Sequence, residues 1–144
     1  MSITNYLKET SQVIDRVDTW EKAIEVAAQP LINLGKIKSG YVDSMVENIK
    51  NLGPYIILLP GVAMPHARPD ENVLESSLAF LKINEGVKFS EDTDKVYLMF
   101  VLAAKDSNSH IEIIEQLTDI LGDDDKVEEL KNAKTLEEVI NILK

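Results

Sequence analysis

Residues 96–103 read VYLMFVLA, an eight-residue apolar run without polar alternation. A strand that is apolar on both faces is typical of the centre of a sheet covered by helices on each side. Apolar runs at residues 55–59 (YIILL) and 77–83 predict two more strands, and residues 12–17 show a weaker strand pattern. Prolines bound the run at 55–59, which we interpret as a buried strand.

Helical patterns lie on both sides of these strands. Apolar residues recur at helical spacing over residues 19–34, where Asp18 or Thr19 can cap the start and Gly35 can end the helix. A second helix is expected over residues 40–52, stopped by the glycine that follows.

The C-terminal third returns to helix. Ser109 and Glu112 form an S-x-x-E capping box ahead of apolar residues at helical spacing, and Thr135 with Glu138 repeats the signature. Helices, then strands, then helices predict one α/β domain over residues 1–144, a layered sandwich with a central mixed sheet flanked by helices on both faces.

Composition excludes several classes of function. The 144 residues carry a formal net charge of −10, which argues against a nucleic-acid or anionic membrane-surface partner. No apolar run approaches the roughly 20 residues of a membrane span, and no signal peptide is visible, so we expect a cytoplasmic protein. The chain has no cysteine, which excludes disulfides, a thiol nucleophile and thiolate metal sites.

One of the two histidines lies in the stretch PGVAMPHARPD, residues 60–70. Pro65 and Pro69 restrict the residues before them, so His66 is expected on a stiff connector just after a strand. An imidazole, whose unperturbed pKa is about 6.5, is a competent nucleophile near neutral pH and can carry a covalent group. Arg68 adds a permanent cation that can pair with phosphate.

The other histidine, His110, directly follows Ser109, so we expect it at the first position of a capped helix. Unpaired N–H groups and partial positive charge at a helix start suit a phosphoryl group, and we assign Ser109 to this phosphate-binding end. A short loop separates His110 from the strand at 96–103, just as His66 follows the strand at 55–59. If these strands are parallel, both histidines emerge at one sheet edge. Alternatively, His110 is a capping-region residue bonded only locally.

The segments GPYIILLPGVAMPHARPDENV and VLAAKDSNSHIEIIEQLTDIL resemble the mannitol/fructose-type enzyme IIA family of the phosphoenolpyruvate-dependent sugar phosphotransferase system, over essentially the whole chain. The resemblance implies a phosphotransferase component. In it, His66 accepts a phosphoryl group from the phosphocarrier protein HPr as a tele-phosphohistidine and passes it to a cysteine of the cognate enzyme IIB, for coupled sugar uptake and phosphorylation. His110 matches the second histidine, which orients the nucleophile and stabilises charge. The loop is most similar to the ascorbate-type branch, which suggests ascorbate as the sugar.

One departure from the family concerns charge. Mannitol-type relatives carry an arginine in the helix before the first strand, whereas VENIKNLGPY has none. Arg68 is our candidate for the missing cation, and Lys50 is a weaker one. No P-loop or carboxylate cluster accompanies the loop, so no metal or cofactor is expected.

Other sites and functions were weighed. The two histidines do not match a compact zinc spacing, and residues 122–125 (GDDD) lack the alternating ligands of an EF-hand, so these aspartates are interpreted as helix caps. Val62, Ala63 and Met64 either form a docking rim for partners or pack under the loop. A phosphorylation-dependent regulatory module, like the nitrogen-related branch, is the alternative function; an interaction domain without phosphorylation is a third.

Overall fold

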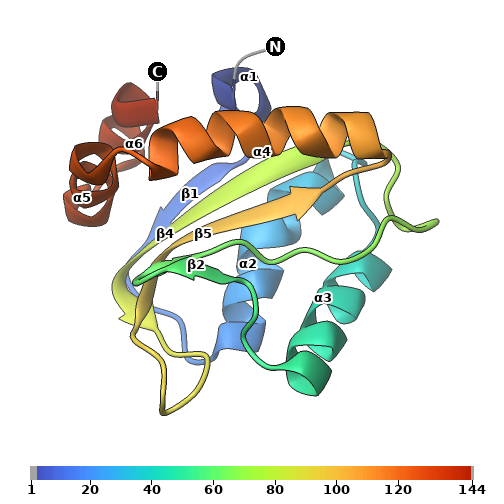
Figure 1. The fold of residues 1–144 in the computed structure, drawn as a ribbon, viewed down its shortest axis with the longest axis horizontal. Coiled ribbons are helices and arrows are strands. Elements are labelled where there is room, and N and C mark those ends of the chain that lie inside the picture. Colours follow the sequence, from blue (N-terminus) through green and yellow to red (C-terminus); the bar gives the residue numbers. More distant parts are fainter. Residues whose placement is uncertain (1–2, 144) are drawn as a thin grey trace.

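The computed structural model describes residues 3–143, apart from the side chains of Thr4, Ser107, Ser109 and His110. Its elements along the chain are α1 (Ile3–Leu7), β1 (Ser11–Ile14), α2 (Trp20–Asn33), α3 (Ser39–Leu52), β2 (Ile57–Leu59), β3 (Val62–Ala63), β4 (Ser77–Val87), β5 (Val96–Ala103), α4 (Ser107–Leu121), α5 (Asp124–Asn132) and α6 (Leu136–Leu143). Figure 1 shows the helices packed around one sheet.

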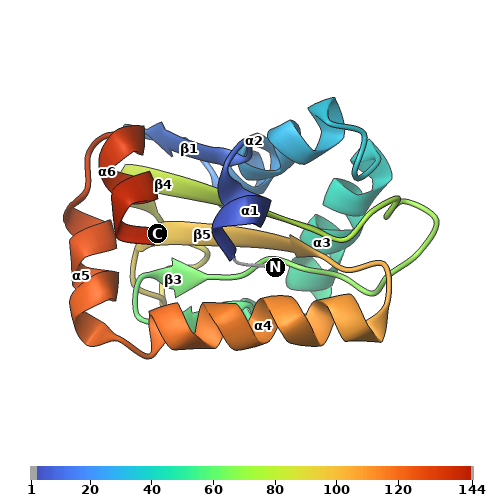
Figure 2. The ribbon, with the colours of Figure 1, turned by 90° about the horizontal axis from the view of Figure 1, so that it is seen from above.

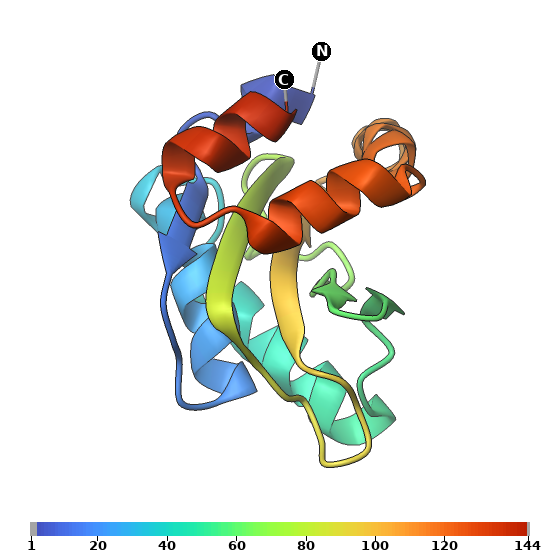
Figure 3. The same cartoon turned by 90° about the vertical axis from the view of Figure 1, so that its left-hand side faces the viewer.

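The sheet has five strands in the order β1-β4-β5-β3-β2. It is mixed, because β4 pairs antiparallel with β5 while β3 pairs parallel with it. Helices α2 and α3 cover one face, and α1, α4, α5 and α6 cover the other (Figures 1 and 3). The predicted single α/β sandwich is therefore confirmed, with β5 at its centre.

Each face of β5 enters a different hydrophobic core. Met99 and Val101 pack with the α2 and α3 side, whereas Leu98, Phe100 and Leu102 pack with α4 and the C-terminal helices. This two-residue alternation is the ordinary geometry of a strand. The uninterrupted apolar run follows because both faces are buried, which the sequence pattern correctly indicated.

Most helix ends lie where the sequence placed them. The Thr19 side chain accepts a hydrogen bond from the Lys22 N–H and caps α2. Gly53, at φ +83°, ends α3 with a backbone conformation that glycine adopts without strain. The Asp123 side chain accepts from the N–H groups of Asp125 and Lys126, which confirms the helix-cap interpretation.

One strand prediction was wrong, and one short strand was not predicted. The run YIILL is not a buried strand: β2 covers only residues 57–59 and lies at the sheet edge, where Leu58 is 44% exposed. The sequence also gave no sign of β3, because two residues are too few to show a periodicity.

The start of α4 was also misplaced. The helix begins at Ser107, so Ser109 is its third residue and His110 its fourth, and the predicted capping box does not lie at the helix start. The pattern fits two registers, since Asp106 is also a residue type favoured just before a helix.

We predict that Asp123→Ala lowers the free energy of unfolding by about 1 kcal/mol, because it removes the acceptor of two otherwise unpaired N–H groups of α5. Glu128→Ala, an exposed carboxylate within the same helix, serves as a charge-matched control and should change it by less than about 0.5 kcal/mol. Urea unfolding measures both. Equal losses in the two variants would contradict the capping role.

Candidate functional site

The two histidine-bearing segments meet at one edge of the sheet. β3 and β5 run parallel, and the chain leaves their carboxyl ends into the His66 segment and into α4 respectively. Figure 2 shows both segments at the same end of the molecule. The two segments thus share one edge, as expected, but the strand that leads into His66 is β3. The YIILL strand, β2, runs antiparallel to β3 and ends at the opposite edge.

The backbone holds the ring of His66. Its Nδ1 lies 2.7 Å from the carbonyl oxygen of Met64. A carbonyl oxygen can only accept, so the hydrogen of this bond belongs to Nδ1 and the lone pair of the neutral ring lies on Nε2. The side chain is half-buried. In this tautomer, Nε2 is the ring nitrogen whose lone pair is available to a nucleophilic reaction.

Tyr55 packs against the same histidine. The two rings meet edge to face with centroids 5.6 Å apart at 83°, and the Tyr55 hydroxyl donates to the His66 carbonyl at 3.1 Å. Sequence reasoning missed this role, because Tyr55 was counted only as part of an apolar run. Its position as the first residue of that run, directly after Pro54, was the available signal.

A second tyrosine lies beneath the segment. Tyr41 is fully buried in α3, and its hydroxyl accepts from the Ala67 N–H at 3.0 Å while donating to the Leu102 carbonyl at 2.7 Å. Burial raises the pKa of Tyr41 to about 12, with smaller raising contributions from Asp70 and Tyr55, against a lowering by the Ala67 hydrogen bond. The hydroxyl therefore keeps its proton throughout the physiological range.

The cationic candidates lie at the surface. Arg68 is exposed two residues after His66, and Lys50 is exposed in the last turn of α3. Within the described part of the chain, neither side chain makes an ion pair. Both cations thus remain free of internal carboxylates, and their assignment to phosphate stays a prediction.

The start of α4 has the polarity of any helix N-terminus. Because α4 begins at Ser107, the first four residues end at His110, and the N–H groups of a first turn have no partner within the helix. The side chains of Ser109 and His110 lie outside the described residues. Their predicted roles are carried forward as predictions.

The docking-rim hypothesis for residues 62–64 is wrong. Val62 and Ala63 are fully buried and Met64 is 8% exposed, because β3 lies inside the sheet. Exposed apolar side chains are found nearby instead, at the end of α3, in the following turn and on β2: Leu52, Tyr55, Leu58 and Leu59. We call these four residues the β2 patch; Tyr55 joins it to His66.

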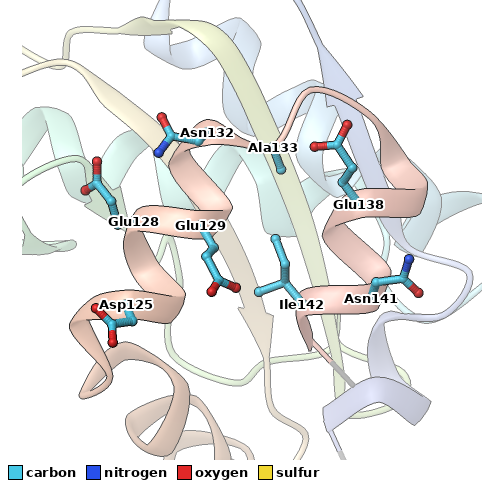
Figure 4. A pocket seen from close by; sticks show the side chains of 8 residues that line it. All are labelled: Asp125, Glu128, Glu129, Asn132, Ala133, Glu138, Asn141 and Ile142. Carbon is cyan, nitrogen blue, oxygen red and sulfur yellow. The ribbon is translucent and has the colours of Figure 1, made fainter.

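The described residues show no group of three metal-ligating side chains. Asp125, Glu128, Glu129 and Glu138 line a hollow between α5 and α6 (Figure 4), where their negative charge opposes an anionic ligand. In the same described part, no helix is both long and apolar enough to cross a bilayer.

Residues 5–144 match the family model described as "Phosphoenolpyruvate-dependent sugar phosphotransferase system, EIIA 2". The mannitol-specific cryptic phosphotransferase enzyme IIA component of Escherichia coli is 32% identical, over 99% of this chain and 98% of that protein. An ascorbate-specific EIIA component from Shigella boydii is 30% identical over 88% of this chain and 83% of its own length.

Solved structures agree with the sequence comparisons. The solution structure of the Escherichia coli cryptic mannitol enzyme IIA superposes with a TM-score of 0.91 at 31% identity, over 99% and 98% of the two chains. Enzyme IIA of the Escherichia coli mannitol system was solved in complex with phosphorylated enzyme IIB. It superposes with a TM-score of 0.78 at 29% identity, over 94% of each chain.

We predict that neutral His66 is the Nδ1–H tautomer, because its Nδ1 donates to the Met64 carbonyl. Two-bond ¹H–¹⁵N correlation spectra at high pH distinguish the tautomers, and His66→Ala assigns the signal. An Nε2–H tautomer would show that the ring is turned the other way and that Nε2 is not the nucleophile.

Proposed function

Because the chain belongs to the EIIA 2 family of the phosphoenolpyruvate-dependent sugar phosphotransferase system, whose members are phosphotransferase components, we propose that His66 carries the phosphoryl group. The observation that supports this most is the Nδ1 contact with the Met64 carbonyl, which leaves Nε2 free at a half-buried surface position. In this tautomer Nε2 carries no proton, so the neutral ring can attack through it without an adjacent base.

The proposed transfer has two in-line steps. The Nε2 lone pair of His66 attacks the phosphorus of phospho-HPr, and the bond from phosphorus to the HPr imidazole breaks, with its electron pair returning to that ring. A cysteine thiolate of enzyme IIB then attacks the same phosphorus, a P–S bond forms, and the P–Nε2 bond breaks. The Met64 carbonyl stabilises the Nδ1–H while the ring carries positive charge.

Groups around His66 would neutralise the negative charge of the phosphoryl group. Transfer of a phosphoryl group depends mainly on alignment and on balancing negative charge over the equatorial oxygens. We assign this to Arg68, His110, Ser109 and the positive end of the α4 dipole, with Lys50 as the weaker cationic candidate. An exposed guanidinium holds phosphate without burying it, so that the group can be passed on.

The partners in this proposal are HPr and an enzyme IIB, and the working compartment is the cytoplasm. The β2 patch offers exposed apolar surface whose member Tyr55 contacts His66, while the net charge of −10 favours partners with basic contact surfaces. The sugar is recognised by the downstream components, so it is not encoded at this site. Relatives named for mannitol and ascorbate match comparably, and neither name is preferred.

To test the carrier role, the protein is incubated with phosphoenolpyruvate, enzyme I and HPr, and its intact mass is followed. We expect one acid-labile phosphate on the wild type, none on His66→Ala, and about 100-fold slower gain on His110→Ala, the scale of losing one charge-stabilising donor. Absence of phosphate on the wild type with active HPr would refute the proposal. Onward transfer to an enzyme IIB separates a transport role from a regulatory one.

For the missing arginine, Arg68→Ala is compared with Lys50→Ala in the same assay. We expect Arg68→Ala to slow phosphoryl gain by about tenfold or more and Lys50→Ala by less than about twofold, since only Arg68 has a fork that pairs with phosphate bidentately. The reverse order would assign the cationic role to Lys50.

The β2 patch is tested with Leu58→Asp, which places a charge among apolar contacts. We expect the KM for phospho-HPr to rise about tenfold, the effect of losing roughly 1.4 kcal/mol of contact energy, with little change in the rate at saturation. Leu136→Asp is the matched control: Leu136 is 45% exposed, against 44% for Leu58, and lies on α6, which packs near β1 at the opposite sheet edge. Equal effects would reject a docking role.

A further inference from the structure

The hydroxyl of Tyr41 lies between two backbone segments that approach each other near His66. It accepts from the Ala67 N–H at 3.0 Å and lies 2.7 Å from the Leu102 carbonyl oxygen. The Ala67 carbonyl oxygen, at 3.2 Å, is a more distant acceptor. A hydroxyl has one hydrogen, so the shorter contact assigns that hydrogen to Leu102.

The pairing of β3 with β5 extends in the same register as far as this hydroxyl. Val62 pairs with Leu98 and Ala63 with Met99, each 36 positions apart, the same separation as His66 and Leu102. In a parallel ladder, a residue bonds through its N–H to the residue before its partner and through its carbonyl to the residue after it. The Leu102 N–H does donate to the Pro65 carbonyl, at 3.0 Å.

The second bond of that pair would join the Ala67 N–H to the Leu102 carbonyl. Instead, both groups bond to Tyr41. The hydroxyl occupies the place of a ladder hydrogen bond and keeps the two backbones farther apart than a direct bond of about 2.9 Å would. β3 itself pairs with β5 only at residues 62 and 63, and the bond from the Leu102 N–H to the Pro65 carbonyl is the last one in that register before Tyr41 intervenes.

We propose that Tyr41 is a positioning residue: its hydroxyl, inserted into the parallel ladder, sets how far the His66 segment stands from β5 and hence from the start of α4. This inference rests on the proposed role of His66. Because Leu102 lies one residue before the end of β5 and α4 begins at Ser107, the same hydroxyl fixes both segments that bear histidines. On the exposed side, the Tyr55 hydroxyl donates to the His66 carbonyl and the Tyr55 ring packs against the His66 ring. The two tyrosines therefore contact the His66 segment from its buried and its exposed side.

The substitution Tyr41→Phe isolates the hydroxyl. The aromatic ring still fills its place in the core, and the two backbone groups left behind are complementary, so the Ala67 N–H can bond the Leu102 carbonyl directly. The variant is therefore expected to fold, with the His66 segment drawn toward β5. A displacement of about 1 Å at a reacting group can slow a transfer about 100-fold.

The experiment compares wild type, Tyr41→Phe and Tyr97→Phe, the last a half-buried tyrosine at the opposite end of β5. Single-turnover phosphoryl gain from phospho-HPr is measured over a range of donor concentrations. Amide spectra and hydrogen exchange report on the Ala67 N–H. In the wild type, proton NMR tests for a slowly exchanging Tyr41 hydroxyl with a nuclear Overhauser contact to that amide.

We expect Tyr41→Phe to fold, to lose about 100-fold in the saturating rate with little change in KM, and to shift the Ala67 amide, while Tyr97→Phe behaves as wild type. A merely structural tyrosine would lower stability without this split between rate and KM. Saturating rates within about twofold of wild type would overturn the proposal.

Two further outcomes are separable. If Tyr41→Phe does not fold, the wild-type hydroxyl resonance decides: its contact with the Ala67 amide supports the inserted hydroxyl, and its absence overturns it. If the wild type accepts no phosphate, the proposed function fails. The Ala67 amide shift in Tyr41→Phe then still tests whether the Tyr41 hydroxyl lies between the Ala67 N–H and the Leu102 carbonyl.

Discussion

The parallel pairing of β3 with β5 is the constraint on which the rest of the site depends. Two paired residues in β3 are enough to place the following segment along the carboxyl half of β5, in unbroken register as far as His66. Since α4 follows the same end of β5, the two segments that carry the histidines converge without a dedicated scaffold. Antiparallel pairing at this position would send His66 to the far end of the sheet.

Among the described residues, a backbone carbonyl and two tyrosine hydroxyls hold the segment around His66 in place. The Met64 carbonyl orients the His66 ring, and the hydroxyls of Tyr41 and Tyr55 bond the chain on its buried and exposed sides. Neutral partners fix geometry without the desolvation cost of a buried ion pair. The guanidinium of Arg68 is exposed two residues after His66, so it is accessible to the phosphoryl group that we propose His66 carries.

The distribution of charge over the molecule explains how a chain of net negative charge can bind an anion. Part of the negative charge lies away from His66, on the carboxylates around the hollow between α5 and α6 at the other end of the molecule (Figure 2). At ordinary ionic strength, exposed charges act over only about 8–10 Å. Near His66, the exposed guanidinium of Arg68 and the positive end of the α4 dipole therefore oppose the carboxylate of Asp70.

The sequence by itself determined the central strand, because burial on both faces leaves an unbroken apolar run, and the ends of α2 and α3, because Thr19 and Gly53 act locally. It also indicated His66 through a motif of neighbouring residues. Only the tertiary structure decided that β2 is an exposed edge, since burial depends on what lies beside a strand. Tyr41 was beyond sequence reasoning for the same reason: its hydroxyl bonds residues 26 and 61 positions away, and a buried aromatic at helical spacing gives no sign of distant partners.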